Sequence, residues 1–257
     1  VFSGFVLRGR PITDKLDNAY CKYCFRMPEI RASIISECTY TTRALTNGRQ
    51  LSKIAILLPS VPEQQMIAEA LSDVDELIDS LEKLIEKKKA IKQGAMQELL
   101  TGRKRLNKFE GKWEVTTLGK MLTIAHGKNQ ANVESRYGKY PILATGGVIG
   151  KTDTFLYDKE SVLIGRKGTI DHPLYMNTPF WTIDTLFYTI LSDNVYAKFI
   201  YYLFCLINWN LYNEASGVPS LNAKTISNIV VKIPNIKEQR AIATILSDMD
   251  TEIEALT

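Results

Sequence analysis

The sequence predicts an α+β protein in which globular segments of mixed strands and short helices are joined to long α-helices that form an antiparallel coiled-coil spacer. Three observations predict this class. A helical stretch occurs twice, both copies carry apolar residues at coiled-coil spacing, and the segment between them is rich in Gly, Thr, Tyr and β-branched residues. Short strand-forming runs that are separated from long helical stretches, rather than alternating with them, indicate an α+β arrangement.

The repeat defines the units of the chain. Residues 59–81 return without gaps as residues 234–256, an offset of 175, with 11 of 23 positions identical. Leu51–Ile54 is likewise mirrored by Ile226–Ile229. An offset of this length exceeds the period of solenoid repeats, so each unit consists of a domain and a connector. The 257 residues therefore hold about one and a half units.

Both copies have the start signals of a helix, a proline near the first turn followed by a glutamate. We expect the first helix to run from Pro62 to Thr101, with Gly102 as its cap. At about 1.5 Å per residue it would be about 60 Å long. Apolar residues at alternating steps of four and three form a heptad seam through which two helices can pair. These helix-pairing residues are Ile67, Leu71, Val74, Ile78, Leu81 and Ile85, and in the second copy Ile242, Leu246, Met249, Ile253 and Leu256. After Lys88 the first seam shifts to Ile91, Ala95 and Leu99.

Four segments follow from this division. Residues 106–232 are expected to form a complete domain, residues 59–105 the first spacer helix and residues 233–257 the start of the second, while residues 1–58 resemble the last third of a domain like 106–232. In the complete domain we expect strands at Glu114–Leu118, Thr154–Tyr157, Ser161–Ile164 and Ile229–Ile233, and a helix at Tyr196–Tyr212. In the first segment we expect an aromatic patch at Tyr20–Phe25 and a strand at Ile54–Leu58.

Composition narrows the class of partner. With 23% charged and 45% hydrophobic residues and no apolar run of about 18 residues, the chain is expected to be globular and cytoplasmic, with its four cysteines reduced. The net charge of +4 is unevenly distributed. Residues 1–60 carry +5 and residues 106–232 carry +3, whereas residues 61–105 carry −1 and residues 233–257 carry −3. Positive globular segments suit a polyanion such as nucleic acid.

Several motifs resemble known sites without matching them. Residues 145–152 end like a phosphate-binding loop, but Thr145 stands where its first glycine belongs. Cys21 and Cys24 lack a second pair of ligands, which favours buried thiols over zinc. His126 and His172 have no evident nucleophile or carboxylate partner, so we expect no catalysis, no cofactor and no metal. The basic cluster 103–105 is interpreted as a helix-end feature, with contact to a DNA backbone as the second interpretation.

The repeated pattern Pro-x-x-x-Glu-Gln-x-x-Ile-Ala, followed by Leu-Ser-x-x-Asp, closely resembles the specificity subunit of type I restriction-modification enzymes. The runs 140–150, 163–169 and 216–222 look like elements of that family's target recognition domains, and 97–103 like the end of its spacer helix. The resemblance implies a non-catalytic subunit in which each recognition domain reads one half of a bipartite DNA sequence. It also implies that the helices hold the domains apart and bind methyltransferase subunits, and through them the restriction subunit.

The candidate DNA-binding residues are those that can form bidentate hydrogen bonds to bases or hold phosphates, and that lie in glycine-flanked loops. They are Lys128, Asn129, Gln130, Arg136, Lys139, Lys151, Arg166, Lys167, Asn222 and Lys224. The alternative at each is an exposed turn that happens to be basic.

A second class of function stays open, a coiled-coil scaffold whose globular domain binds another protein and reads no DNA. Because part of the first seam has no partner within the sequence, self-association through exposed heptads is also a prediction.

Overall fold

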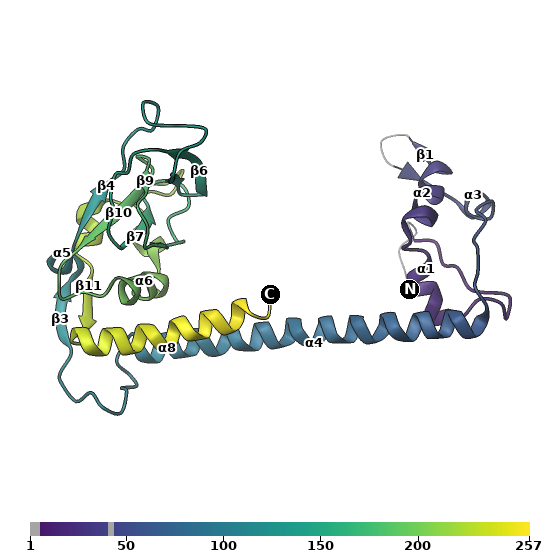
Figure 1. The fold of residues 1–257 in the computed structure, drawn as a ribbon, viewed down its shortest axis with the longest axis horizontal. Coiled ribbons are helices and arrows are strands. Elements are labelled where there is room, and N and C mark those ends of the chain that lie inside the picture. Colours follow the sequence, from purple (N-terminus) through teal and green to yellow (C-terminus); the bar gives the residue numbers. More distant parts are fainter. Residues whose placement is uncertain (1–5, 41–43) are drawn as a thin grey trace. The chain divides into compact units, whose positions relative to one another are not determined.

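The computed structural model describes residues 6–40 and 44–257. The chain divides into two compact units, Val1–Leu84 and Ile85–Thr257. Helix α4 (Val61–Leu99) is continuous over 39 residues and belongs to both units (Figure 1), which confirms the predicted first helix. It ends at Leu99, two residues before the expected end, and Gly102 has a φ of 71°, a conformation that glycine adopts without strain. Among the described residues no helix is long and apolar enough to cross a membrane.

The first unit contains short elements packed on the start of α4. They are α1 (Asn18–Cys24), α2 (Pro28–Ser36), β1 (Thr39–Tyr40), β2 (Ala44–Leu45) and α3 (Gly48–Leu51). Its small core consists of Tyr20, Cys24 and Ala68. The strand expected at Ile54–Leu58 is wrong, because this stretch pairs with no strand in the described chain and Leu57 is 98% exposed. Its repeat counterpart, β11 (Val230–Ile233), does pair, with β3 (Glu114–Thr117). A strand needs such a partner to form.

The second unit contains residues 106–232, which are built on an antiparallel sheet. The order of that sheet is β4 (Leu122–His126), β10 (Leu186–Leu191), β7 (Ser161–Gly165) and β8 (Leu174–Met176). A second sheet has the order β6 (Gly147–Thr152), β5 (Tyr140–Ala144) and β9 (Trp181–Thr182). The helical elements are α5 (Leu118–Met121), α6 (Ala197–Leu206), a 3-10 turn at Trp209–Tyr212, α7 (Ala223–Ser227) and α8 (Ile236–Glu254).

Alternation along β7 separates two cores. Val162 and Ile164 belong to the large core with α6, whereas Leu163 belongs to a smaller core with Leu143 of β5. Successive strand residues point to opposite faces, so one strand serves both. The predicted strands around 114, 161 and 230 are confirmed, but the one at Thr154–Tyr157 is wrong. This stretch makes only an isolated bridge to Phe180, and the ring of Tyr157 packs in the smaller core instead.

The helix expected at Tyr196–Tyr212 is shorter than predicted. It ends at Leu206, and the chain resumes in the 3-10 turn. The indole Nε1 of Trp209 donates to the carbonyl of Phe204 at 2.9 Å. This side-chain hydrogen bond occupies a carbonyl at the helix end that a longer helix would have used.

Helix α8 lies against the last part of α4 (Figure 1) and runs antiparallel to it. Lys88 pairs with Glu252 at 2.6 Å, while Arg105, further along the chain, pairs with Glu238 at the other end of α8. Ile91, expected on the seam, is 52% exposed. The other two residues of the shifted seam are as expected, since Leu99 lies in the large core and Ala95 packs against it, and Met96 adds a buried contact that was not expected.

Candidate nucleic-acid interface

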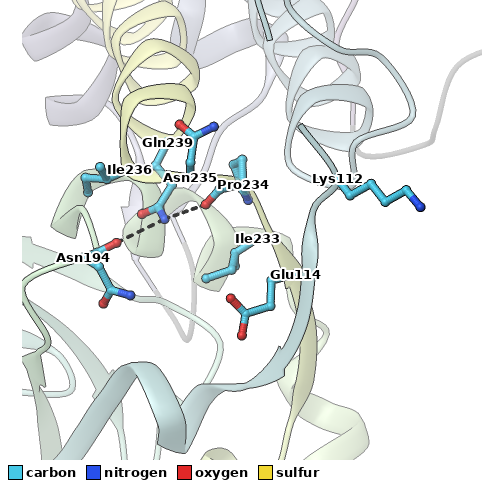
Figure 2. Close-up of a pocket in the computed structure, with 8 residues that line it drawn as sticks. All are labelled: Lys112, Glu114, Asn194, Ile233, Pro234, Asn235, Ile236 and Gln239. Atoms are coloured by element: carbon cyan, nitrogen blue, oxygen red, sulfur yellow. Dashed lines mark hydrogen bonds between the residues drawn. The ribbon is translucent and has the colours of Figure 1, made fainter. Parts of the chain in front are cut away.

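A buried glutamine of α8 binds backbone groups of the domain. The side chain of Gln239 accepts a hydrogen bond from the backbone N–H of Tyr196 at 2.9 Å, directly before α6. Its amide nitrogen donates to the carbonyls of Pro234 at 2.9 Å and Asn194 at 3.4 Å (Figure 2). The residue is 1% exposed, so these bonds satisfy polar groups that have no access to water.

The first copy of the repeat makes the same junction. Gln64 accepts from the backbone N–H of Asp17 at 2.9 Å, directly before α1. It donates to the carbonyls of Lys15 at 2.8 Å and Pro59 at 2.9 Å. Helix α1 thus occupies in the first unit the place that α6 occupies in the second. The repeated Glu-Gln of the sequence motif therefore marks a joint between a globular unit and a long helix.

The aspartate of the motif completes the joint further along the helix. The hydroxyl of Tyr202 on α6 donates to Asp250 at 2.7 Å, and the hydroxyl of Tyr23 on α1 donates to Asp75 at 3.0 Å. Burial, together with the hydrogen bond to Asp250, raises the pKa of Tyr202. Lys22 lies 2.5 Å from Asp75, and its hydrogen bond lowers the pKa of that carboxyl.

Arg105 has a different role from the two that the sequence suggested. Its guanidinium makes a bidentate pair with Glu238, at 2.6 Å from Nε and 2.8 Å from the second nitrogen. Glu238 is 1% exposed, and a buried carboxylate requires such a partner. Arg105 therefore fastens the end of α4 to the start of α8 and is not free to contact a DNA backbone. Sequence spacing gave no signal for this pair, since 133 residues separate its members.

Most of the candidate DNA-binding residues lie in loops that contact one another. Loop 127–139 joins β9 through the backbone N–H of Lys128, which donates to Thr182 at 2.8 Å, and it joins β6 through Ser135, whose N–H donates to Lys151 at 2.8 Å. The turn 166–168 joins the loop 214–222, because Gly168 N–H donates to Pro219 at 2.9 Å. We call these loops of the second unit together the loop cluster.

The loop cluster is basic, and most of its cations are exposed. Lys128, Arg136, Lys139, Lys151, Lys167 and Lys224 are exposed, and Arg166 is half-buried. The guanidinium of Arg166 donates to the carbonyl of Asp184 at 3.1 Å. Gly168 has a φ of 97°, which keeps the turn tight after the basic pair. A glycine is required at position 165 by the fold itself, because the carbonyl of Thr169 leaves no space there for a Cβ.

The amide candidates serve partly local purposes. Asn222 caps α7 by accepting from the N–H of Lys224 at 2.8 Å, and Asn129 accepts from the N–H of Ala131 at 2.8 Å. Gln130 is half-buried. An oxygen used in a cap leaves the amide NH₂ available for a base acceptor but removes bidentate reading of adenine.

The sequence analysis missed exposed apolar side chains within the loop cluster. Tyr137 is 83% exposed next to Arg136, whose guanidinium lies 5.6 Å from the ring centre. Val148 and Ile149, on the β5–β6 hairpin, are 65% and 49% exposed. Apolar groups on a groove-entering ribbon contact thymine methyl groups in protein–DNA complexes. In the sequence, Val148 and Ile149 could be noticed only as an apolar pair directly after Gly146 and Gly147.

The cysteine and histidine motifs that the sequence analysis set aside have side chains packed against other residues of the fold. Cys24 is buried against Tyr20 and Ala68, and burial raises the pKa of its thiol. The ring of His126 packs edge-on against Phe187 at 4.9 Å. In the parts of the chain that the structure describes, no three His, Cys, Asp or Glu side chains gather as they would around a metal ion.

Residues 2–93 and 110–257 match the family described as "Type I restriction modification DNA specificity domain". The chain belongs to this family.

Individual relatives agree with this assignment. The chain is 24% identical to the type I restriction enzyme MjaVIII specificity subunit of Methanocaldococcus jannaschii, over 93% of this chain and 65% of that protein. It is 25% identical to the putative MjaX specificity subunit of the same organism, over 95% of this chain and 64% of that protein. The chain thus spans less than two thirds of the length of these relatives.

Solved structures show the same fold. The S subunit of a type I restriction-modification system from M. genitalium aligns with a TM-score of 0.69 at 21% identity, covering 94% of this chain and 68% of that one. The HsdS subunit from Thermoanaerobacter tengcongensis aligns with a TM-score of 0.57 at 16% identity, covering 95% of this chain and 65% of that one.

Proposed function

We propose that this chain is a non-catalytic, sequence-specific DNA-binding component of a type I restriction-modification system. The domain 106–232 reads one half of a bipartite double-stranded DNA target through its loop cluster. Residues 1–58 are the corresponding part of a second recognition domain. The helices 59–105 and 233–257 set the spacing of the domains and dock methyltransferase subunits, and through them the restriction subunit. No cofactor takes part.

The observation that carries this proposal is the duplicated junction. Gln64 and Gln239 make the same three kinds of hydrogen bond, each between a globular unit and a long helix. A subunit that reads two half-sites needs two domains attached in the same way. The second unit also presents basic loops, which supply the phosphate contacts that dominate affinity for DNA.

Salt-dependent DNA binding tests the proposal. Fluorescence anisotropy with random duplexes, repeated from low to high salt, should show affinity that falls as salt rises. The double variant R166A/K167A should bind more weakly, and its salt slope should be shallower by about 1 for each phosphate that the variant no longer neutralises. The matched control is K112A/K232A, which removes two exposed lysines beside the β3–β11 pair, outside the loop cluster.

The two classes of function give opposite results. A chain without any salt-sensitive binding would favour the interaction scaffold over the DNA reader. If both double variants lose affinity equally, binding reflects total charge and the loop cluster is not the interface. If binding is normal but R166A/K167A leaves the salt slope unchanged, the turn 166–168 is outside the interface.

A further inference from the structure

The hairpin of β5 and β6 carries two neighbouring apolar side chains that the core does not use. Val148 and Ile149 are 65% and 49% exposed. In a regular strand, two successive residues would point to opposite faces of the sheet. The pairing register shifts between Ile142 and Leu143, and Ile149 has no residue opposite it on β5. It is the extra residue of a β-bulge, which redirects side chains, so both apolar residues face solvent.

The tip of this hairpin is narrow and stands free of the rest of the unit. Ala144 pairs with Gly147, so the turn consists of the two residues between them. Apart from chain neighbours, no atom lies within 4 Å of the position that a Cβ would take at Gly146 or Gly147. Strand β6 lies at the end of the second unit remote from α8 (Figure 1). A two-stranded ribbon of this kind fits the major groove of DNA.

Basic segments adjoin the hairpin at its tip and along its free edge. The turn 166–168 adjoins the tip, since a Cβ at Gly168 would lie 3.5 Å from the hydroxyl oxygen of Thr145. Loop 127–139 adjoins the free edge of β6, to which it donates a backbone hydrogen bond at 2.8 Å. These two segments carry most of the exposed cations of the loop cluster. Cations that hold phosphates around an apolar tip would place that tip against the edges of the bases.

We propose that Val148 and Ile149 determine specificity by contacting the 5-methyl group of thymine in the major groove. This proposal rests on the proposed function, because it requires the loop cluster to bind double-stranded DNA, and it adds the base that the hairpin selects. Aliphatic side chains form no hydrogen bonds, and the thymine methyl group is the apolar feature that base pairs present in the major groove. The undistorted minor groove, about 6 Å wide, is too narrow for a two-stranded ribbon.

Removing the methyl group from the DNA tests the proposal without changing any hydrogen bond. The chain first selects its preferred duplex from a random pool, and each thymine of that duplex is then replaced singly by uracil. At one or two positions the Kd, measured by fluorescence anisotropy, should rise about fourfold, the contribution of one buried methyl group. At the remaining positions uracil should leave the affinity unchanged.

The protein side of the contact is removed in parallel. The variant V148A/I149A should bind the thymine duplex at least about fourfold more weakly. It should no longer distinguish thymine from uracil at the sensitive positions, because the two changes remove one interaction. The matched control is V115A/V230A, which truncates two valines that are 61% and 65% exposed on the β3–β11 pair, outside the loop cluster. This control should retain the full preference for thymine.

Three results would overturn the proposal. One is an affinity that no uracil substitution changes, or a preferred duplex without A·T pairs. Another is a preference for thymine that persists in V148A/I149A, which would assign the methyl contact to a different residue. The third is an equal loss of that preference in V115A/V230A, which would indicate an indirect effect through the fold.

The same measurements separate this proposal from its alternatives. A loss of affinity in V148A/I149A without any sensitivity to uracil would instead fit an apolar wedge inserted between base steps. A chain that binds no DNA would remove the proposed function together with this inference. Salt-sensitive, sequence-selective binding that is insensitive to uracil would remove this inference alone.

Discussion

Both copies of the repeated motif attach a small helix to a long one through the same polar contacts, but among the described residues the apolar seam is more deeply buried in the second copy. Gln64 and Gln239 bind equivalent backbone groups, whereas Leu71 is 40% exposed and Leu246 is fully buried. The junction residues bind groups of their own unit. The seam residue Leu246 lies in a core that includes residues of α4 and α6. A repeated sequence therefore encodes its junction contacts in both places, while burial of its seam depends on the partner present.

The buried ion pair offers the largest test of this difference. Replacing Arg105 with Met leaves Glu238 buried without a partner, which should destabilise the second unit by about 3–5 kcal/mol. Replacing Glu63, the counterpart of Glu238 in the first copy, with Gln should change stability by less than about 0.5 kcal/mol, as for other surface positions. The measurement is urea unfolding followed by tryptophan fluorescence, because Trp113, Trp181 and Trp209 all lie in the second unit. Hydrogen exchange of residues 61–84 follows the first unit.

The control for Arg105 is its neighbour. Lys104 is 73% exposed, 4.0 Å from the exposed Glu98, so K104M removes one positive charge without uncovering a buried group. If R105M costs no more than K104M, the pair with Glu238 does not hold the two helices together.

Truncating an apolar seam residue should have the next largest effect on stability. L246A should destabilise the second unit by about 3 kcal/mol, since it opens a cavity in a closely packed core. L71A should cost less than about 1 kcal/mol, because the side chain it truncates is already partly in water. Unfolding by urea measures the first, and hydrogen exchange of residues 61–84 measures the second. Equal losses would mean that the first seam is covered in solution.

Features that depend on neighbouring residues could be predicted from the sequence, whereas features that depend on distant contacts could not. The repeat, the start of both helices and the end of α4 near Gly102 were predictable, because proline, glutamate and glycine act within one turn. The strand at Ile54–Leu58 was not, since its apolar residues match those of β11 but its partner strand is not among the described residues. The strand-forming residues are present in both copies, and only the second has a strand to pair with.

The candidate interface shows a similar limit. The basic turn 166–168 was visible from its composition, but nothing local indicated that Arg166 would donate to Asp184 or that Asn222 would cap α7. The sequence showed that Gln64 and Gln239 are repeated, but it did not show what their side chains bind. Their role required the position of Asp17 and Tyr196, which lie 47 and 43 residues away in the sequence.

The junction should respond alike in both copies. Gln64→Leu and Gln239→Leu each leave backbone groups without hydrogen-bond partners, and each should destabilise its own unit by about 2 kcal/mol. Hydrogen exchange of α1 and α6 reports the two separately. Gln65→Leu is the matched control, because Gln65 is the exposed neighbour of Gln64. An effect in one copy alone would break the equivalence of the two junctions.

The smallest effect is the response of the two junctions to pH, in opposite directions. The pKa of Tyr202 is raised, so the unfolded chain releases this proton near pH 10 while the folded chain retains it. Its contribution to stability is complete below about pH 10 and is lost as pH rises further. The pKa of Asp75 is lowered, so its contribution is complete above about pH 4 and is lost as pH falls through the folded value.

Two conservative variants separate these contributions. Y202F should reduce the fall in stability of the second unit between pH 9 and pH 11, each variant being compared with its own value at pH 7. The observable is the urea midpoint by tryptophan fluorescence, which reports only this unit. D75N should leave that alkaline fall unchanged and should instead reduce the loss of helical circular dichroism below pH 4. A D75N chain that altered the alkaline response would show that the two junctions are coupled through α4, the helix they share.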